Sequence, residues 1–314
     1  MSASAKGIWA MVLACTVWGL SPIFYRALAD VPPLEVLCHR SIWSVVIFAA
    51  VLGLQGRLAE IGALLRERRS LLLLALAGVI ISVNWFLFIY ATQVDLVTES
   101  SLGYYIFPLV AVLFGYVFFG ERLSRPQLAA VGLAALAVAI LAVRLGTVPW
   151  ISLALAITFA AYAAIKKTIA AGPVLSVTAE ILIVLPLAVI WIWGAHGAGW
   201  SGLGAQDPGA FGTDPATTAL LVASGAMTAG PLILLSYATR RIALATAGVV
   251  QYLNPTLQFF CAMVLFSEPL TPAHALAFPL IWLALAFYSV DSLAQERAAR
   301  KRARAAGTSA ATVR

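Results

Sequence analysis

The chain has 314 residues, of which 62% are hydrophobic and only 11% are charged. Soluble domains carry about 25% charged residues, and a soluble fold of this size cannot bury so much apolar surface. The composition therefore excludes a soluble protein. The formal net charge of +7 does not indicate a nucleic-acid partner, because membrane proteins concentrate Lys and Arg in their cytoplasmic loops.

Apolar segments long enough to cross a bilayer recur along the chain, since a helical span needs about 20 mostly apolar residues. We predict spans at 7–28, 35–54, 70–91, 98–119, 127–143, 148–166, 174–193, 217–237, 245–267 and 273–291. The expected fold is an all-α polytopic membrane protein with ten transmembrane helices embedded in membrane lipid.

Residues of different chemistry recur at a constant offset of 147 positions. The recurring pairs are Tyr90 and Tyr237, Tyr105 and Tyr252, Pro108 and Pro255, and Glu121 and Glu268. We interpret the chain as two five-helix repeats, 1–145 and 146–293, followed by a basic cytoplasmic tail at 294–314. Because each repeat has an odd number of spans, the second must enter the membrane inverted. Inverted repeats are typical of secondary transporters.

The distribution of basic residues predicts the orientation of the chain. If residue 1 is cytoplasmic, 17 of the 20 Lys and Arg residues lie in cytoplasmic loops or in the tail. In that orientation Arg144 is in an external loop, and Arg26 and Arg40 are within spans. The positive-inside rule therefore places both termini in the cytoplasm.

Several motifs resemble the EamA family of the drug/metabolite transporter superfamily, in particular its RarD-like permeases. They are Trp18-Gly19-x-x-Pro22, Glu35-x-x-x-His39-Arg40, Asn84-Trp85-x-x-Phe88, Glu99-Ser100-Ser101-Leu102-Gly103-Tyr104 and Gln251-Tyr252-x-x-Pro255. The resemblance covers nearly the whole chain and implies ten helices, a bacterial inner-membrane location and transport of small molecules. It does not specify the substrate.

Ionisable residues inside spans are expensive and often functional, at about 2.5–3.5 kcal/mol for an Arg or Asp at a helix centre. Glu35 and His39 share one helix face, with Arg40 beside it. One interpretation is a charged lane, together with Glu99, that binds an anionic group or relays a proton. The alternative is structural, with an internal Glu35–Arg40 pair and a hydrogen-bonded His39.

Prolines at matching positions of the two repeats predict the binding site, because interrupted helices of transporters commonly line it. Pro108 and Pro255 are the expected kinks, although prolines also occur in spans as simple bends. The substrate-binding residues expected around these kinks are Trp18, Asn84, Trp85, Tyr104, Tyr105, Tyr162, Gln251, Tyr252 and Asn254. For Trp18, Asn84 and Trp85, packing between helices is an equal alternative.

Sequence motifs of metalloproteases, serine hydrolases and nucleotide-driven pumps do not occur in the chain, so we expect no enzyme, no cofactor and no metal. The primary hypothesis is a secondary transporter that exports small metabolites or drug-like compounds by alternating access. Proton coupling and uncoupled facilitated diffusion both stay open, as does the oligomeric state. A non-transporting membrane receptor or scaffold is the competing hypothesis.

Overall fold

The computed structural model describes residues 3–197, 200, 209–242 and 244–311, and within these ranges the chain forms helices and no strand. In chain order the elements are α1 (Ala3–Arg26), α2 (Pro33–Leu54), α3 (Leu58–Arg66), α4 (Arg68–Gln93), α5 (Val97–Phe119), α6 (Arg125–Leu145), α7 (Trp150–Lys167), α8 (Pro173–Gly197), α9 (Pro215–Ala223), α10 (Ala226–Thr239), α11 (Leu244–Gln251), α12 (Leu253–Phe260), the π-helix η1 (Cys261–Leu265) and α13 (Pro272–Ala311). The all-α prediction is confirmed for this part of the chain.

Nine helical segments of the described residues are long and apolar enough to cross a membrane, counting α9 and α10 together as Pro215–Thr239. The predicted span at 245–267 is instead divided among α11, α12 and η1. The interruption lies just before Pro255, which lacks a backbone donor and whose ring crowds the carbonyl four residues earlier. That carbonyl belongs to Gln251, the last residue of α11.

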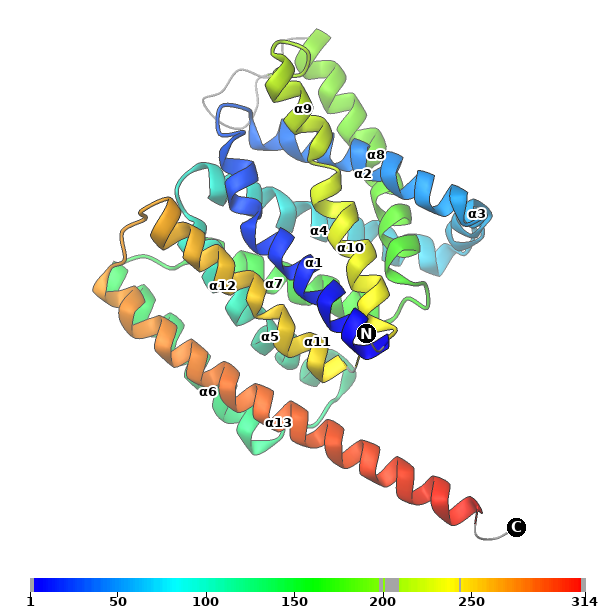
Figure 1. Ribbon diagram of the computed structural model, residues 1–314. Coiled ribbons are helices and arrows are strands. Elements are labelled where there is room, and N and C mark those ends of the chain that lie inside the picture. The colour runs from blue at the N-terminus through cyan, green and yellow to red at the C-terminus, as the bar shows by residue number, and fades with distance from the viewer. Residues whose placement is uncertain (1–2, 198–199, 201–208, 243, 312–314) are drawn as a thin grey trace.

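The helices pack as a bundle in which elements far apart in the sequence lie side by side (Figure 1). The most extensive helix contacts join α5 to α7, α6 to α13, α1 to α10, α2 to α8 and α4 to α7. Beyond residue 293 the chain continues as part of α13, which extends past the bundle to Ala311 (Figure 1). The predicted basic tail is therefore helical through most of its length.

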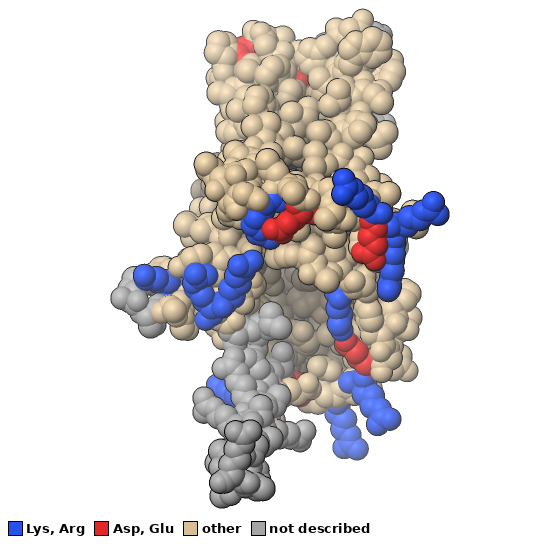
Figure 2. Space-filling model, turned by 90° about the vertical axis from the view of Figure 1, so that its right-hand side faces the viewer, with Lys and Arg blue, Asp and Glu red and all other residues tan. Residues whose placement is uncertain are grey.

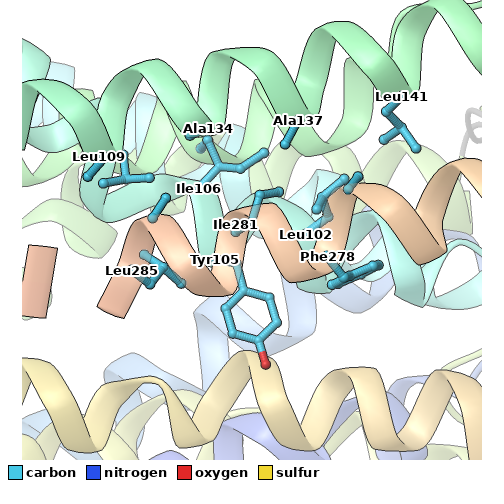
Figure 3. Close-up of a cluster of buried hydrophobic side chains, with 14 of the residues drawn as sticks. Leu102, Tyr105, Ile106, Leu109, Ala134, Ala137, Leu141, Phe278, Ile281 and Leu285 are labelled. Carbon is cyan, nitrogen blue, oxygen red and sulfur yellow. The ribbon is translucent and has the colours of Figure 1, made fainter. Parts of the chain in front are cut away.

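The largest buried apolar cluster joins α5, α6 and α13 (Figure 3). Its members include Leu102, Tyr105, Ile106, Leu109, Ala130, Ala134, Ala137, Leu141, Phe278, Ile281 and Leu285. The alanines of α6 let it approach its neighbours closely, which matters in lipid because helix association there depends on packing rather than on exclusion of water.

Two glycines set the spacing of helix pairs that surround the centre of the bundle. A Cβ atom at Gly103 of α5 would lie 2.7 Å from the carbonyl oxygen of Ser152 in α7. A Cβ atom at Gly78 of α4 would lie 2.9 Å from the carbonyl oxygen of Glu180 in α8. Any larger residue at either position would push the two helices apart.

Candidate functional site

A cavity of about 1090 Å³ lies among helices from both halves of the chain. Most predicted substrate-binding residues line it, namely Trp18, Asn84, Trp85, Tyr104, Tyr162, Gln251, Tyr252 and Asn254. Pro108, Pro255 and Arg40 also line it, together with Phe159 and Met227, which were not predicted. The walls are thus mainly aromatic and apolar with a few polar groups, as is usual for small-molecule sites.

Tyr105 is the predicted substrate-binding residue that lies outside this lining. Its hydroxyl hydrogen-bonds to Thr256 Oγ1 at 2.8 Å, and its ring packs edge-on against Phe278 of α13 (Figure 3). Side chains of adjacent helical residues point about 100° apart, so Tyr104 faces the cavity and Tyr105 faces the core. The structure therefore gives Tyr105 a packing position between α12 and α13.

Asn84 connects three helices at the cavity wall. Its Nδ2 donates to the carbonyl oxygen of Leu155 at 3.0 Å and to Thr158 Oγ1 at 2.8 Å, both in α7. Its Oδ1 accepts a hydrogen bond from the Tyr104 hydroxyl at 3.1 Å. The amide is fully buried, and these bonds hold the Tyr104 ring in place beside the cavity.

Arg40 brings a cation to the cavity although it is only 4% exposed. Its Nε donates to Thr228 Oγ1 at 2.5 Å. The guanidinium carbon lies 4.2 Å from the ring centroid of Trp85 and 5.8 Å from that of Tyr25. Aromatic faces attract cations through their quadrupole, which offsets part of the cost of burying the charge.

Glu35 and His39 turn away from the cavity toward the segment that precedes α9. The Glu35 carboxylate accepts hydrogen bonds from the backbone N–H groups of Gly209 at 2.8 Å and Phe211 at 3.2 Å. The His39 ring stacks on the Phe211 ring with centroids 4.6 Å apart, and neither ring nitrogen has a hydrogen-bond partner in the described part of the chain. The predicted charged lane is therefore divided, with Arg40 alone of these three residues at the cavity.

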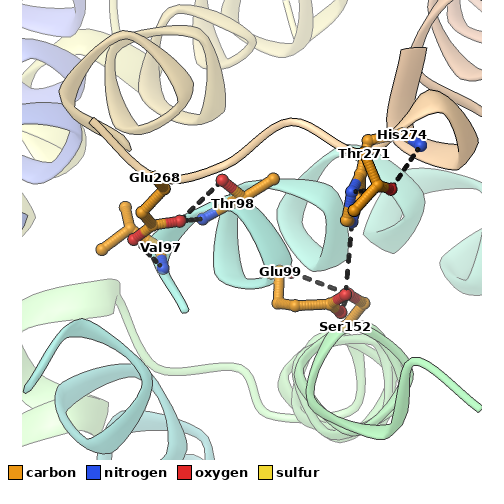
Figure 4. Close-up of polar contacts among 7 residues, drawn as sticks. All are labelled: Val97, Thr98, Glu99, Ser152, Glu268, Thr271 and His274. Atoms are coloured by element: carbon orange, nitrogen blue, oxygen red, sulfur yellow. Dashed lines mark hydrogen bonds and ion pairs between the residues drawn. The ribbon is translucent and has the colours of Figure 1, made fainter. Parts of the chain in front are cut away.

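Glu268 joins the start of α5 to the segment that follows η1 (Figure 4). Its carboxylate accepts from the backbone N–H groups of Val97 at 2.7 Å and Thr98 at 2.8 Å, and from the Thr98 hydroxyl at 2.6 Å. The first N–H groups of a helix have no partner within the helix and carry partial positive charge. A buried carboxylate at this position satisfies them.

Glu99, the fourth residue of the predicted lane, lies near Glu268 and also outside the cavity lining (Figure 4). Its carboxylate accepts a hydrogen bond from the Ser152 hydroxyl and lies 3.6 Å from Nε2 of His274. We call this group the polar seal; its members are Val97, Thr98, Glu99, Ser152, Glu268 and His274. The polar seal connects α5, α7 and α13 at one end of the bundle.

An ion pair at the cavity wall, between a partly buried lysine and a fully buried glutamate, was not predicted. Lys166 Nζ lies 2.5 Å from Glu180 Oε1, and the Tyr162 hydroxyl donates to Glu180 Oε2 at 3.1 Å. The Glu180 side chain is completely buried, whereas Lys166 and Tyr162 line the cavity. Lys166 was expected at the cytoplasmic loop that follows the predicted span 148–166. One residue in the sequence could have indicated the pair: Glu180 is a carboxylate inside a predicted apolar span, and a carboxylate there requires a partner.

Comparisons with known proteins identify a common class. A family model of the EamA-like transporter family matches residues 5–143. Protein RarD of Streptomyces exfoliatus is 40% identical over 292 residues, covering 92% of this chain and 90% of that protein. An uncharacterized transporter of Vibrio cholerae is 36% identical over 296 residues, covering 94% of this chain and 96% of that protein. A protein of known crystal structure with 18% sequence identity superposes on this chain with a TM-score of 0.60. The match covers 92% of this chain and 97% of that protein chain, which indicates a shared fold.

Proposed function

This chain belongs to the EamA-like transporter family as a RarD-like permease, and we propose that it is a secondary transporter of the bacterial inner membrane. The observation that carries the proposal is the cavity between the two halves, which is lined by Trp85, Tyr104, Gln251 and other polar and aromatic side chains. A central site between two halves of the chain is what alternating access requires.

We further propose ten membrane crossings in two inverted repeats, 1–145 and 146–293. The helices α4, α5 and α6 begin 147 residues before α9, α11 and α13, respectively. With this offset α1 corresponds to α7, α4 to α9 and α10 together, and α5 to α11 and α12 together. The helix α1 packs against α10 and α12 of the second repeat, and its counterpart α7 packs against α4 and α5 of the first. This exchange of packing partners supports a twofold relation between the repeats, in which the interrupted segment 244–265 is the counterpart of α5.

The ends of these two counterparts support the same relation. Gly120 and Ser267 both adopt positive φ values, of 63° and 53°. The following residue in each case is a glutamate whose backbone N–H donates six residues back, Glu121 to Gly115 and Glu268 to Ala262. The positions that match in sequence thus share a backbone conformation as well.

For orientation, we propose that both termini are cytoplasmic. On the face of the molecule that Figure 2 shows, the Lys and Arg side chains gather in one half. The positive-inside rule requires such a concentration on the cytoplasmic side. The cavity lining includes Lys166 and Pro173, on either side of the connection between α7 and α8, which we place in the cytoplasm. In this orientation we propose that the cavity opens toward the cytoplasm and that the polar seal closes its outer side.

The proposed cargo is a small metabolite or drug-like compound, and the proposed direction is export. Coupling to protons is a further proposal, for which Glu99 beside His274 is the best placed of the predicted residues because the pair lies in the polar seal. An uncoupled facilitator would use the same cavity without this coupling. A membrane receptor or scaffold is the alternative that makes no use of the cavity.

A substrate panel tests the proposal directly. A deletion strain with and without the chain is exposed to metabolites and drugs, and each compound whose toxicity or accumulation changes is then measured by counterflow in proteoliposomes. Saturable counterflow that Tyr104→Ala abolishes and Tyr105→Phe preserves would support transport through the cavity. Unchanged cellular function of Tyr104→Ala, with no counterflow for any compound, would support the receptor or scaffold instead.

A further inference from the structure

Arg40 is the cavity charge that the protein itself does not neutralise. Arg40 and Lys166 are the two charged residues among the described residues that line the cavity. Lys166 is paired with Glu180 at 2.5 Å. Glu35, the acidic residue nearest to Arg40 in sequence, instead accepts hydrogen bonds from the backbone of Gly209 and Phe211. The described part of the chain thus provides Arg40 with no carboxylate partner.

The surroundings of Arg40 hold its guanidinium in one orientation. The Nε atom is used by Thr228 Oγ1, and the group lies against Trp85 at 4.2 Å. No acceptor within the described ranges is bonded to the two terminal Nη groups, and the residue borders the cavity. A planar guanidinium with free terminal N–H groups binds a carboxylate or phosphate through two parallel hydrogen bonds.

A buried arginine without a counterion is costly, since the desolvated charge must be compensated by a partner. Cation–π contacts with Trp85 and Tyr25 offset part of this cost, but they leave the formal positive charge in place. A substrate that brings its own negative charge would neutralise it. Its remaining surface would contact the aromatic wall formed by Trp85, Tyr104 and Phe159.

We infer that the transported substrates are organic anions, in which a carboxylate or phosphate binds Arg40 and an apolar body fills the rest of the cavity. This inference rests on the proposed transport function and specifies its substrate class. Thr228 and Trp85 act as positioning residues that orient the guanidinium toward the ligand. The Lys166–Glu180 pair adds no net charge to the cavity, so one anionic group suffices for neutrality.

The test uses probes that share one body and differ in charge: 3-phenylpropanoate, 3-phenylpropyl phosphate, 3-phenylpropanamide and 3-phenylpropylamine. Their binding to the full chain in lipid nanodiscs is followed by tryptophan fluorescence, with empty nanodiscs as the blank. We expect one or both anions to bind at least about tenfold more tightly than the amide, and the amine to bind least, because charge-assisted bonds are the strong ones. Comparison of the carboxylate with the phosphate identifies which anion fits.

Variants assign the preference to Arg40. Arg40→Gln is expected to reduce the anion-to-amide affinity ratio to about 1, whereas Arg40→Lys should keep a smaller preference because an ammonium is a point charge without the planar fork. Arg144→Gln removes an exposed arginine at the end of α6 and should leave the ratio unchanged. If Arg40→Gln does not fold, the wild-type ratio and Arg40→Lys still decide the matter.

Two results would overturn the inference. One is that neither anion binds the wild-type chain more tightly than the amide, which includes the case in which no probe binds. The other is that Arg40→Gln retains the full anion preference. Counterflow of the same probes separates this inference from the transport proposal. Anion binding without flux would contradict transport alone, and equal flux of anion and amide would contradict anion recognition alone.

Discussion

Glu268 accepts two hydrogen bonds from Thr98, one from the backbone N–H at 2.8 Å and one from the hydroxyl at 2.6 Å, although 170 positions separate these residues. The contact joins the residue stretch that follows the interrupted segment 244–265 to the start of α5. These two segments, as wholes, are counterparts in the proposed repeat. Glu121, the counterpart of Glu268, instead forms an exposed ion pair with Lys167. Of these two glutamates, which are 147 positions apart, Glu268 caps a helix and Glu121 pairs with a lysine at the surface.

We predict that Glu268→Gln opens the outer side of the protein. Hydrogen bonds to a charged group contribute about 1.5–3 kcal/mol, so losing the charge should raise the outward-open population by roughly 10- to 100-fold. The measurement is labelling of Ala111→Cys, a cavity position, by an impermeant maleimide added outside cells, in a chain whose three native cysteines are replaced.

Glu121→Gln is the matched control for this prediction. Its carboxylate contacts Lys167 at the surface, where both side chains are about half exposed, so external labelling should not increase. Equal labelling rates of Ala111→Cys with and without Glu268→Gln would contradict a closing role for Glu268.

We predict that removing one partner of the Lys166–Glu180 pair lowers the free energy of unfolding more than removing both partners. A buried ion pair broken on one side typically loses about 3–5 kcal/mol, because a charge is left buried and unpaired. Lys166→Met should therefore destabilise strongly, and Lys166→Met with Glu180→Leu should recover most of the loss. The free energy of unfolding from a reversible detergent titration measures both.

The exposed Lys167–Glu121 pair provides the comparison. Lys167→Met should change the free energy of unfolding by less than about 1 kcal/mol, as is usual for exposed pairs. If the double variant of the buried pair were as unstable as Lys166→Met alone, the two charges would not be compensating one another.

We predict that Pro255→Ala slows transport without weakening the fold. Alanine restores a backbone N–H that can donate to the Gln251 carbonyl, so α11 and α12 could join into one stiffer helix. We expect turnover to fall about tenfold, or 1.4 kcal/mol in the barrier, with thermal stability equal or higher. Pro186→Ala, at an exposed position inside α8, should leave turnover unchanged; a similar fall there would mean that Pro255 has no special role.

The positions of the spans were predictable from the sequence because lipid allows few solutions. A segment in the bilayer must satisfy its own backbone and present apolar side chains, so long apolar runs become helices. The runs at 70–91 and 98–119 accordingly appear as α4 and α5. The interruption at Tyr252 was foreseen only as a kink at Pro255, because proline chemistry shows where a helix is weakened and not whether it breaks.

The direction in which each side chain points was decided only by the tertiary structure. The spans are apolar on all sides, so they have no polar stripe to distinguish cavity, core and lipid. Tyr104 and Tyr105 are therefore equivalent in sequence, yet one lines the cavity and the other packs on α13. Likewise, the sequence by itself placed Glu35 beside Arg40, whereas packing brought Gly209 to Glu35 and left Arg40 facing the cavity. Partners for buried charges come from segments distant in the sequence, which no local pattern specifies.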